Sequence, residues 1–440
     1  MELQELLRAR EERVQYQYEL LSTYKLPLIC YTMNIPGPTK NSPLITEAFL
    51  LGERQILDRF PNIIYSDHRI LDTGCEGSYV LREDPAYIKS LCMEMESQPP
   101  LGRILDLDVL APDGEKLSRG NPRPCLLCME DARICRRRGS HPIEDVAGQA
   151  TALLRQALDA DLANRVGSLA VRSLLYELLT TPKPGLVDQR NNGSHKDMDP
   201  FTFAASAAAL APFFTQWCLE GSLHRDLSPP ELFQKLRPHG REAEATMYRA
   251  TGGINTHKGA IFSLGLMCAA AGRLGSLSSP EALCAEAAAM VQGITDRELR
   301  SLEPHAAQTK GEQLYLSHSL SGIRGQAEKG FPSVLHIGIP TLKKGYELGL
   351  SRHRAGCAAL LNMLAKEADT ALISRSSLER YEALRRELET LLQATPYPTE
   401  DQLKAMDDRF IAENLSPGGC ADLLALCYFL TEADRENFSS

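Results

Sequence analysis

The spacing of apolar residues changes near residue 145 of this 440-residue chain. Before that point, short apolar runs between proline-rich and glycine-rich turns are typical of strands, as at 26–31, 62–65 and 103–109. From residue 149 onward, apolar residues recur at intervals of three and four, which is the period of amphipathic helices. The pattern therefore predicts an α+β domain at 1–145, a linker near 139–148 and an all-α domain at 146–440.

The second domain reads as a series of helices ended by glycine, proline and polar caps. No convincing strand is expected after residue 150. The predicted helices cover 152–166, 168–179, 203–219, 231–236, 242–250, 260–271, 280–291, 332–348, 353–368, 378–392, 402–414 and 421–430.

Composition narrows the class of protein. Apolar residues make up 43% and charged residues 24% of the chain, the balance of a soluble folded protein. Charged residues are spread through the first ten positions, where a signal peptide would need an apolar core. No apolar run approaches the roughly 20 residues of a membrane span. We therefore expect a cytoplasmic protein with no membrane contact. The net charge of −9 argues against general nucleic-acid binding, which needs excess Lys and Arg.

One loop in the helical half carries unusual chemistry. It runs through Thr181-Pro-Lys-Pro-Gly-Leu-Val-Asp188 to Gly193-Ser-His-Lys-Asp-Met-Asp199. Three carboxylates, a histidine and several cations lie there among residues that stiffen or loosen the backbone. Such a loop is typical of a functional site rather than of packing.

Three further segments of the helical half combine helix starts with charge. Asn255-Thr-His-Lys258 follows a Gly-Gly pair and opens a helix, where free backbone N–H groups can bind phosphate. Ser416-Pro-Gly-Gly419 repeats this arrangement before Asp422, and Asp369 lies close to Arg375. Taken singly, each segment is better explained as a helix cap or a surface ion pair, and only their joint presence favours a functional site.

Together, these sequence motifs resemble those of the triphosphoribosyl-dephospho-CoA synthase family over roughly residues 150–430. The matching words are Thr-Pro-Lys-Pro-Gly-Leu-Val-Asp, Gly-Ser-His-Lys-Asp-Met-Asp, Asn-Thr-His-Lys-Gly, Asp-Thr-x-Leu-Ile-Ser-Arg and Leu-Ser-Pro-Gly-Gly-x-Ala-Asp-Leu-Leu. The resemblance implies an all-α fold that joins ATP to 3′-dephospho-CoA and releases adenine, which makes the precursor of the citrate lyase prosthetic group.

That reaction is a displacement at the anomeric carbon of ATP, in which carboxylates stabilise an oxocarbenium-like state and accept the proton of the attacking hydroxyl. Mg²⁺ is expected with the triphosphate, because it prefers oxygen ligands such as aspartate. His195 or His257 would assist the leaving adenine, with a structural hydrogen bond as the alternative for each. The expected catalytic residues are Asp188, Asp197, Asp199 and His195. The residues expected to bind substrate or phosphate are Lys183, Lys196, Asn255, His257, Lys258, Asp369, Arg375, Ser416, Gly418, Gly419 and Asp422.

Two positions differ from the residues that are common in the motifs of this family. Ala371 stands where Asn is common, and Gln326 stands where Glu is common, with Glu328 close enough in sequence to substitute for it. We expect activity to survive both changes.

The first half has its own pair of carboxylates. In 105–109, Leu and Val alternate with Asp106 and Asp108, which places both aspartates on one face of a strand, about 7 Å apart. Such a pair can share Mg²⁺ during phosphoryl transfer, although an exposed polar strand face gives the same pattern. Seven basic residues against two acidic ones between 116 and 138 provide a local anion site.

A set of thiols follows the strand. Cys125, Cys128, Cys135 and His141 are spaced Cys-x2-Cys-x6-Cys-x5-His, which is adequate for tetrahedral zinc. Buried thiols without metal are the alternative. Disulfides are not expected among the 12 cysteines of such a chain.

The first half resembles the citrate lyase holo-acyl-carrier-protein synthase family over roughly residues 1–142. The matching segments are 32–40, 101–109 and 123–128, followed by Cys135-Arg-Arg-Arg138 and His141. The resemblance implies a nucleotidyltransferase-like domain that moves phosphoribosyl-dephospho-CoA to a serine of the apo acyl carrier protein (γ) subunit and releases pyrophosphate. By that resemblance Asp106 and Asp108 would be catalytic, because they would bind Mg²⁺ and help to activate the serine hydroxyl. Lys40, Arg103, Arg119 and Arg123 would contact phosphates.

The two families catalyse consecutive steps, which explains why both sets of motifs occur in one chain. Two alternatives remain open at this point. The same chemistry could serve malonate decarboxylase, or one half could have lost catalysis and act as a docking module for the acyl carrier protein.

Overall fold

The structure is a computed structural model that describes residues 3–300, 307 and 309–439. It divides into two compact units, Met1–Asp161 and Leu162–Ser440. The division falls inside one continuous helix, α5 (Ile143–Leu179). The start of α5 belongs to the first unit because Ala150, Leu154 and Ala157 are buried in its core. The division thus lies 16 residues beyond the predicted boundary at residue 145, and 143–148 is helical rather than a linker.

The first unit is built on a four-stranded antiparallel sheet in the order β2-β3-β1-β4. Its elements are α1 (Leu3–Tyr24), β1 (Leu28–Met33), α2 (Pro43–Arg59), β2 (Ile63–Leu71), β3 (Gly74–Leu81), α3 (Pro85–Ser97), β4 (Leu105–Leu110) and α4 (Ala132–Arg138). The predicted strands correspond to β1, β2 and β4. Sequence reasoning missed β3 and ended β2 too early.

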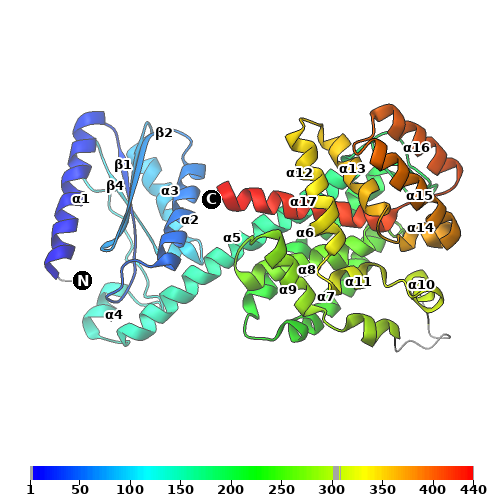
Figure 1. The fold of residues 1–440 in the computed structure, drawn as a ribbon. Coiled ribbons are helices and arrows are strands. Elements are labelled where there is room, and N and C mark those ends of the chain that lie inside the picture. Colours follow the sequence, from blue (N-terminus) through cyan, green and yellow to red (C-terminus); the bar gives the residue numbers. More distant parts are fainter. Residues whose placement is uncertain (1–2, 301–306, 308, 440) are drawn as a thin grey trace. The chain divides into compact units, whose positions relative to one another are not determined.

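Helices cover both faces of this sheet (Figure 1). Alternation along β1 sends Ile29 and Tyr31 to the face packed by α2 and α3. Leu28 and Cys30 point to the other face, where they pack with Leu20 of α1. The sheet is therefore the middle layer of three, and each face has its own apolar cluster.

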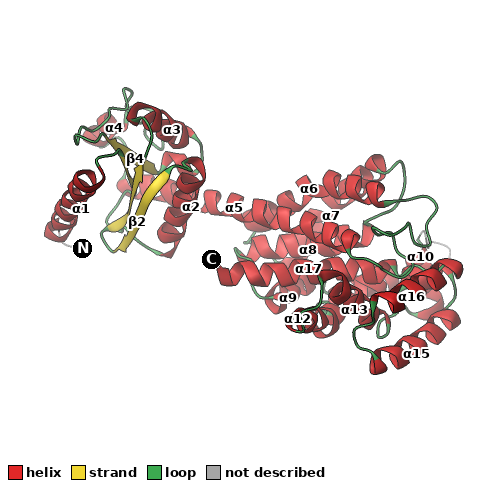
Figure 2. Ribbon diagram, turned by 90° about the horizontal axis from the view of Figure 1, so that it is seen from above, coloured by secondary structure: helices red, strands yellow, loops and turns green. Residues whose placement is uncertain are grey.

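All the regular secondary structure among the described residues of the second unit is helical, in agreement with the prediction (Figure 2). Its helices after α5 are α6 (Pro200–Leu223), α7 (Pro229–Ala250), α8 (Lys258–Leu274), α9 (Pro280–Met290), α10 (Lys310–His318), α11 (Gly322–Glu328), α12 (Ile339–Glu347), α13 (Arg352–Leu364), α14 (Thr370–Arg375), α15 (Leu378–Ala394), α16 (Glu400–Ala412) and α17 (Gly418–Ser439). Short π-helical segments at Asp296–Arg300 and Val334–Gly338 interrupt the series.

Helix α17 lies at the centre of this unit. Every residue from Leu423 to Leu430 is at least nine-tenths buried. A helix that is apolar on all sides is one enclosed by other helices, and α17 packs against α8, α9, α12 and α13. The start of α17 is thereby held in the interior, close to the starts of α8 and α14. None of the helices within the described part of the chain has the length and apolar character to cross a membrane.

Candidate functional site

The alternation in β4 was predicted correctly. Leu105, Leu107 and Val109 are fully buried against α2 and α3, while Asp106 and Asp108 lie on the opposite face. Of these two aspartates, Asp106 lines the large cavity of this unit and Asp108 does not. The volume of the cavity is about 1330 Å³. Asp108 instead forms an ion pair with Lys116, with 2.5 Å between Oδ2 and Nζ. The two carboxylates therefore have different surroundings, although the sequence treats them as a pair.

The cavity is strongly cationic. The predicted Lys40, Arg103, Arg119 and Arg123 all line it. Burial lowers the pKa of Lys40, and the nearby charges of Arg10 and Arg136 lower it further. The full set of basic residues in the lining is Arg10, Arg13, Lys40, Arg103, Arg119, Arg123, Arg133 and Arg136, against the three carboxylates Glu76, Glu96 and Asp106.

Glu96, which sequence reasoning missed, organises part of this wall. It is 3% exposed and accepts hydrogen bonds from the Leu107 backbone N–H (2.8 Å) and from Arg119 Nη1 (2.8 Å). It also pairs with Arg123, whose Nη2 reaches Asp106 Oδ1 at 2.8 Å. A buried carboxylate thus fixes two arginines beside the carboxylate that faces the cavity.

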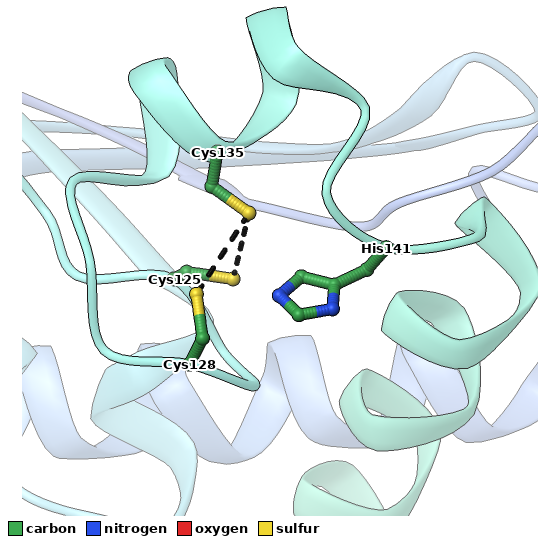
Figure 3. Close-up of side chains that lie close together, drawn as sticks. All are labelled: Cys125, Cys128, Cys135 and His141. Carbon is green, nitrogen blue, oxygen red and sulfur yellow. Dashed lines mark hydrogen bonds between the residues drawn. The ribbon is translucent and has the colours of Figure 1, made fainter.

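The predicted thiol set converges in the same unit. Cys125, Cys128, Cys135 and His141 each direct one ligand atom to a common region, and these four atoms all lie within 4.8 Å of one another (Figure 3). Three of these residues, Cys125, Cys135 and His141, also line the cavity.

In the second unit, Asp188 shapes the 181–199 loop from inside. It is 1% exposed, and its oxygens accept the backbone N–H groups of Lys183 (2.7 Å), Arg190 (2.7 Å) and Asn191 (3.3 Å). Asp407 of α16 accepts from the Gly185 N–H at 2.9 Å and pairs with Arg190. Asp188 and Asp407 therefore hold the loop closed.

Lys183 points inward and pairs with Glu177 of α5, a residue not predicted for the site. Its Nζ also donates to the Glu177 carbonyl oxygen at 2.7 Å. Burial raises the pKa of the Glu177 carboxyl, Lys183 opposes this shift, and Asp188 adds to it. The available sequence signal was a single charged residue within the apolar run 174–179.

Two more predicted carboxylates meet where helices begin. Asp369 caps α14, accepting from Leu372 N (2.9 Å), and also accepts from Cys420 N (2.7 Å) in the first turn of α17. Asp422 accepts from the backbone of Ala260 in the first turn of α8. Burial raises the pKa of both carboxyls. For Asp422, the charges of Glu177 and Asp369 raise it further, so these three carboxylates form one interacting group.

His195 links the loop to two other motif segments. Arg375 Nη2 donates to its Nδ1 (3.1 Å), since a guanidinium can only donate. The other ring nitrogen, Nε2, must then carry the hydrogen and donate to Ser416 Oγ (2.8 Å). Burial first, and then Arg375, lower the pKa of His195 to about 4. His195 is therefore neutral near pH 7 and connects the 181–199, 369–375 and 415–422 segments.

His257 is buried at the start of α8. Its Nδ1 lies 2.8 Å from Ser206 Oγ, while its Nε2 has no hydrogen-bond partner in the part of the chain that the structure describes. Burial, together with the charge of Lys183, lowers the pKa of His257 to about 3. The imidazole is therefore a neutral group with one nitrogen unused.

The other predicted residues lie at the edge of this group. Lys258 pairs with Glu244 at 3.0 Å, and Asn255 Oδ1 accepts from the Lys258 backbone N–H at 3.3 Å. Asp199 caps α6 through Thr202, whereas Lys196 and Asp197 are exposed. Gly418 and Gly419 open α17, and a Cβ at Gly419 would lie 3.1 Å from Asp369 Oδ2.

Comparisons with known proteins divide the chain at a similar position. Residues 1–157 match the family described as apo-citrate lyase phosphoribosyl-dephospho-CoA transferase, CitX. Residues 163–439 match the family described as ATP:dephospho-CoA triphosphoribosyl transferase, CitG.

Relatives cover either the whole chain or its second part. Protein CitXG of Haemophilus influenzae is 37% identical over 97% of this chain and 95% of its own length. Protein CitXG of Leuconostoc mesenteroides subsp. cremoris is 33% identical over 98% of this chain and 97% of its own. A probable 2-(5''-triphosphoribosyl)-3'-dephosphocoenzyme-A synthase of Albidiferax ferrireducens is 42% identical over 63% of this chain and 93% of its own.

Proposed function

The chain belongs to the CitXG family, and we propose that its two units carry out consecutive steps in making and attaching the prosthetic group of citrate lyase. The second unit condenses ATP with 3′-dephospho-CoA and releases adenine. The first unit transfers the resulting phosphoribosyl-dephospho-CoA to a serine of the apo acyl carrier protein subunit and releases pyrophosphate.

The synthase step is supported by the convergence of four motif segments on Glu177, Asp369 and Asp422. A ribose hydroxyl of dephospho-CoA attacks the anomeric carbon of ATP, a C–O bond forms, and the C–N bond to adenine breaks. Carboxylates near that carbon stabilise its positive charge. Asp422 is the best placed to accept the hydroxyl proton, because it keeps some exposed surface, whereas Glu177 is paired with Lys183 and both oxygens of Asp369 accept backbone N–H groups.

The two histidines take different roles in this proposal. His195 already uses both ring nitrogens, so it positions the 181–199 loop against Ser416 and Arg375. His257 has Nε2 to spare. Ser206 accepts from Thr256 at 2.8 Å and can donate its own hydrogen to Nδ1, which leaves Nε2–H as a donor to the leaving adenine. Because the imidazole is neutral, it stabilises the departing adenine anion by hydrogen bonding, and the anion takes its proton from water after it leaves.

Mg²⁺ is part of the proposal for both units. In the second unit, Asp369 and Asp422 would hold it, since a cation offsets the mutual repulsion that raises the Asp422 pKa. In the first unit, Asp106 would hold it alone, because Asp108 is paired with Lys116. When bound, the ion would neutralise charge on the triphosphate, and Mg²⁺ commonly needs only one or two carboxylates besides phosphate oxygens.

The transferase step rests on the eight basic residues around Asp106. Their positive charge complements a triphosphate, and it also stabilises the negative charge that develops on the departing pyrophosphate. The carrier serine oxygen attacks the phosphorus, the bond to pyrophosphate breaks, and Asp106 accepts the serine proton. We assign this unit to the nucleotidyltransferase class of folds because the sheet presents this carboxylate to a phosphate-binding cavity.

The test measures both steps with the full-length chain. With ATP and 3′-dephospho-CoA, chromatography should show adenine release, and mass spectrometry should then show modification of the added apo carrier subunit. Asp106→Asn should release adenine without modifying the carrier. Asp422→Asn should modify the carrier only when the triphosphoribosyl precursor is supplied. Unchanged activity in both variants would refute the assignment, and preference for the malonate decarboxylase carrier would redirect the proposal.

A further inference from the structure

The thiol set of the first unit has the geometry of a metal site. Cys135 Sγ lies 3.5 Å from Cys125 Sγ and 3.9 Å from Cys128 Sγ. Four tetrahedral ligands with Zn–S bonds of about 2.3 Å would place their sulfur atoms about 3.8 Å apart. The observed separations bracket this value, and all three thiols are free.

His141 supplies the fourth position. Figure 3 shows its ring directed at the three sulfur atoms, with one nitrogen foremost. His141 Nε2 is buried and has no hydrogen-bond partner among the described residues. An unpaired buried nitrogen is costly unless something binds it, and a cation held between it and the thiolates would do so.

Separate backbone features direct the four ligands to this point. Cys125 and Cys128 lie in a tight turn closed by a hydrogen bond from Cys125 N to Glu130 O at 2.6 Å. Within the turn, Leu127 N donates to Cys125 Sγ at 3.5 Å, an arrangement that favours a thiolate. Cys135 projects from α4, and the left-handed Gly139 that ends this helix turns the chain back towards His141.

Apolar packing does not account for the cluster. Core thiols such as Cys75 and Cys92 belong to the apolar cluster of the first unit. None of the apolar clusters found among the described residues includes Cys125, Cys128 or Cys135, and Cys128 is exposed. The alternative of simple buried thiols therefore fits poorly here.

We propose that Cys125, Cys128, Cys135 and His141 bind one structural Zn²⁺. Three thiolates and one imidazole satisfy zinc's preference for sulfur and nitrogen and fill its four positions, so no position is open for catalysis. Binding releases the thiol protons, because the ligands are thiolates. The metal assignment does not depend on the proposed reaction.

The position of the site explains what the metal would contribute. Arg103 donates to the Cys125 carbonyl oxygen at 3.0 Å, and Arg133 and Arg136 are carried by the same α4 that carries Cys135. All three arginines line the cavity. Zn²⁺ would thus fix the 123–141 segment, and with it one side of the anion site.

The first experiment is metal analysis of the full-length protein, expressed with added zinc and purified without chelators. We expect about one Zn²⁺ per chain. Cys128→Ser should lower zinc affinity. It is the most informative variant, because the Cys128 side chain is exposed and folding should survive the change. His141→Ala should likewise lower zinc affinity by more than the roughly 10–100-fold that loss of a supporting second-shell contact causes. Cys92→Ala removes a core thiol of the same unit and should keep the full zinc content.

A second readout separates ligation from folding. With Co²⁺ in place of zinc, the protein should show the visible absorption of tetrahedral thiolate-bound cobalt, and His141→Cys should retain the metal with a spectrum shifted towards four sulfur ligands. Chelation should speed trypsin cleavage after the exposed Arg136–Arg138, because α4 would lose its anchor at Cys135. Folded protein with less than about one tenth of an equivalent of zinc and no cobalt spectrum would overturn the proposal, as would unchanged zinc affinity in Cys128→Ser and His141→Ala.

Discussion

Gly259→Ala tests whether the position of the Asp422 carboxylate limits adenine release. Gly259 is the second residue of α8, and a Cβ placed there would lie 2.0 Å from Asp422 Oδ2 and 2.9 Å from its Cγ. Non-bonded heavy atoms attract best at roughly 3.5 Å, so the carboxylate oxygen has to move by about 1.5 Å. The perturbation is therefore a displacement of the proposed base with its chemistry intact.

The expected loss of activity is large, and the expected loss of stability is small. A misplacement of about 1 Å in a reacting group can lower the rate by about 100-fold, which corresponds to about 2.7 kcal/mol of transition-state stabilisation. Alanine favours a helix over glycine by about 1 kcal/mol. This gain roughly offsets the hydrogen bond to the Ala260 backbone, worth about 1 kcal/mol, if Asp422 gives it up.

The assay is the steady-state rate of adenine release from ATP and 3′-dephospho-CoA, with unfolding in urea as the measure of stability. Gly240→Ala is the matched control, because it makes the same substitution within α7, where a Cβ would lie more than 4 Å from every described atom outside the adjacent residues and the backbone of its own helix. It should leave adenine release unchanged. Carrier modification from supplied precursor should be normal in both variants. Adenine release by folded Gly259→Ala within about threefold of the unsubstituted chain would refute the reasoning.

Three further outcomes follow from the same geometry. Arg123→Ala should lower pyrophosphate release with the apo carrier by about 10²–10³-fold, because it removes a fixed cation from the transition state, and should leave adenine release unchanged. Lys183→Met should lower the free energy of unfolding by about 3–5 kcal/mol, since it leaves Glu177 buried without a partner. Adding Glu177→Gln should restore much of that loss. If the effects of the two substitutions simply add, the pairing is contradicted. His195 has its pKa lowered from 6.5 to about 4, so its stabilisation is fully present above pH 6.5 and is lost as the pH falls towards 4. Denaturation across this range should show a loss of about 3 kcal/mol that His195→Asn reduces.

Apolar spacing was a good guide to the fold where each element has a buried face of its own. Strand β4 alternates cleanly and was predicted correctly. Strand β3 begins Gly-Cys-Glu-Gly-Ser, which has few β-favouring residues, and is held by pairing with β1 on one side and β2 on the other. Its existence therefore depends on contacts that are distant in the sequence. The same limit applies to α7, which continues through Pro238 where proline suggested a break between two helices.

The domain boundary was misplaced for a related reason. The glycine and proline residues near 139–148 resemble a linker, yet α5 begins at Ile143 and runs to Leu179 without interruption. Helical periodicity is the same on both sides of residue 161. Only the identity of the packing partner changes along α5, and a single sequence does not contain that information.

Residues of the proposed sites were recognisable where unusual local sequence carries them. The 181–199 loop and the 415–422 segment stand out because proline, glycine and charge occur together. Glu177 and Glu96 did not stand out, because one buried carboxylate in an ordinary helix has no local signature. Their importance follows from the cations that they meet, Lys183 and Arg123, in the folded chain.

The two proposed sites differ in charge, since one is rich in carboxylates and the other in basic residues. This difference gives a reason for both activities to occur in one chain. In the proposed synthase site, the charges of Glu177 and Asp369 both raise the pKa of Asp422, so a triphosphate would need cations in order to bind there. The cavity around Asp106 has eight basic residues and favours the same triphosphate strongly. Under the proposed function, the triphosphoribosyl intermediate would gain electrostatic stabilisation on leaving the carboxylate site for the cationic cavity. This difference would give the two steps a direction without passage of the intermediate through an enclosed channel.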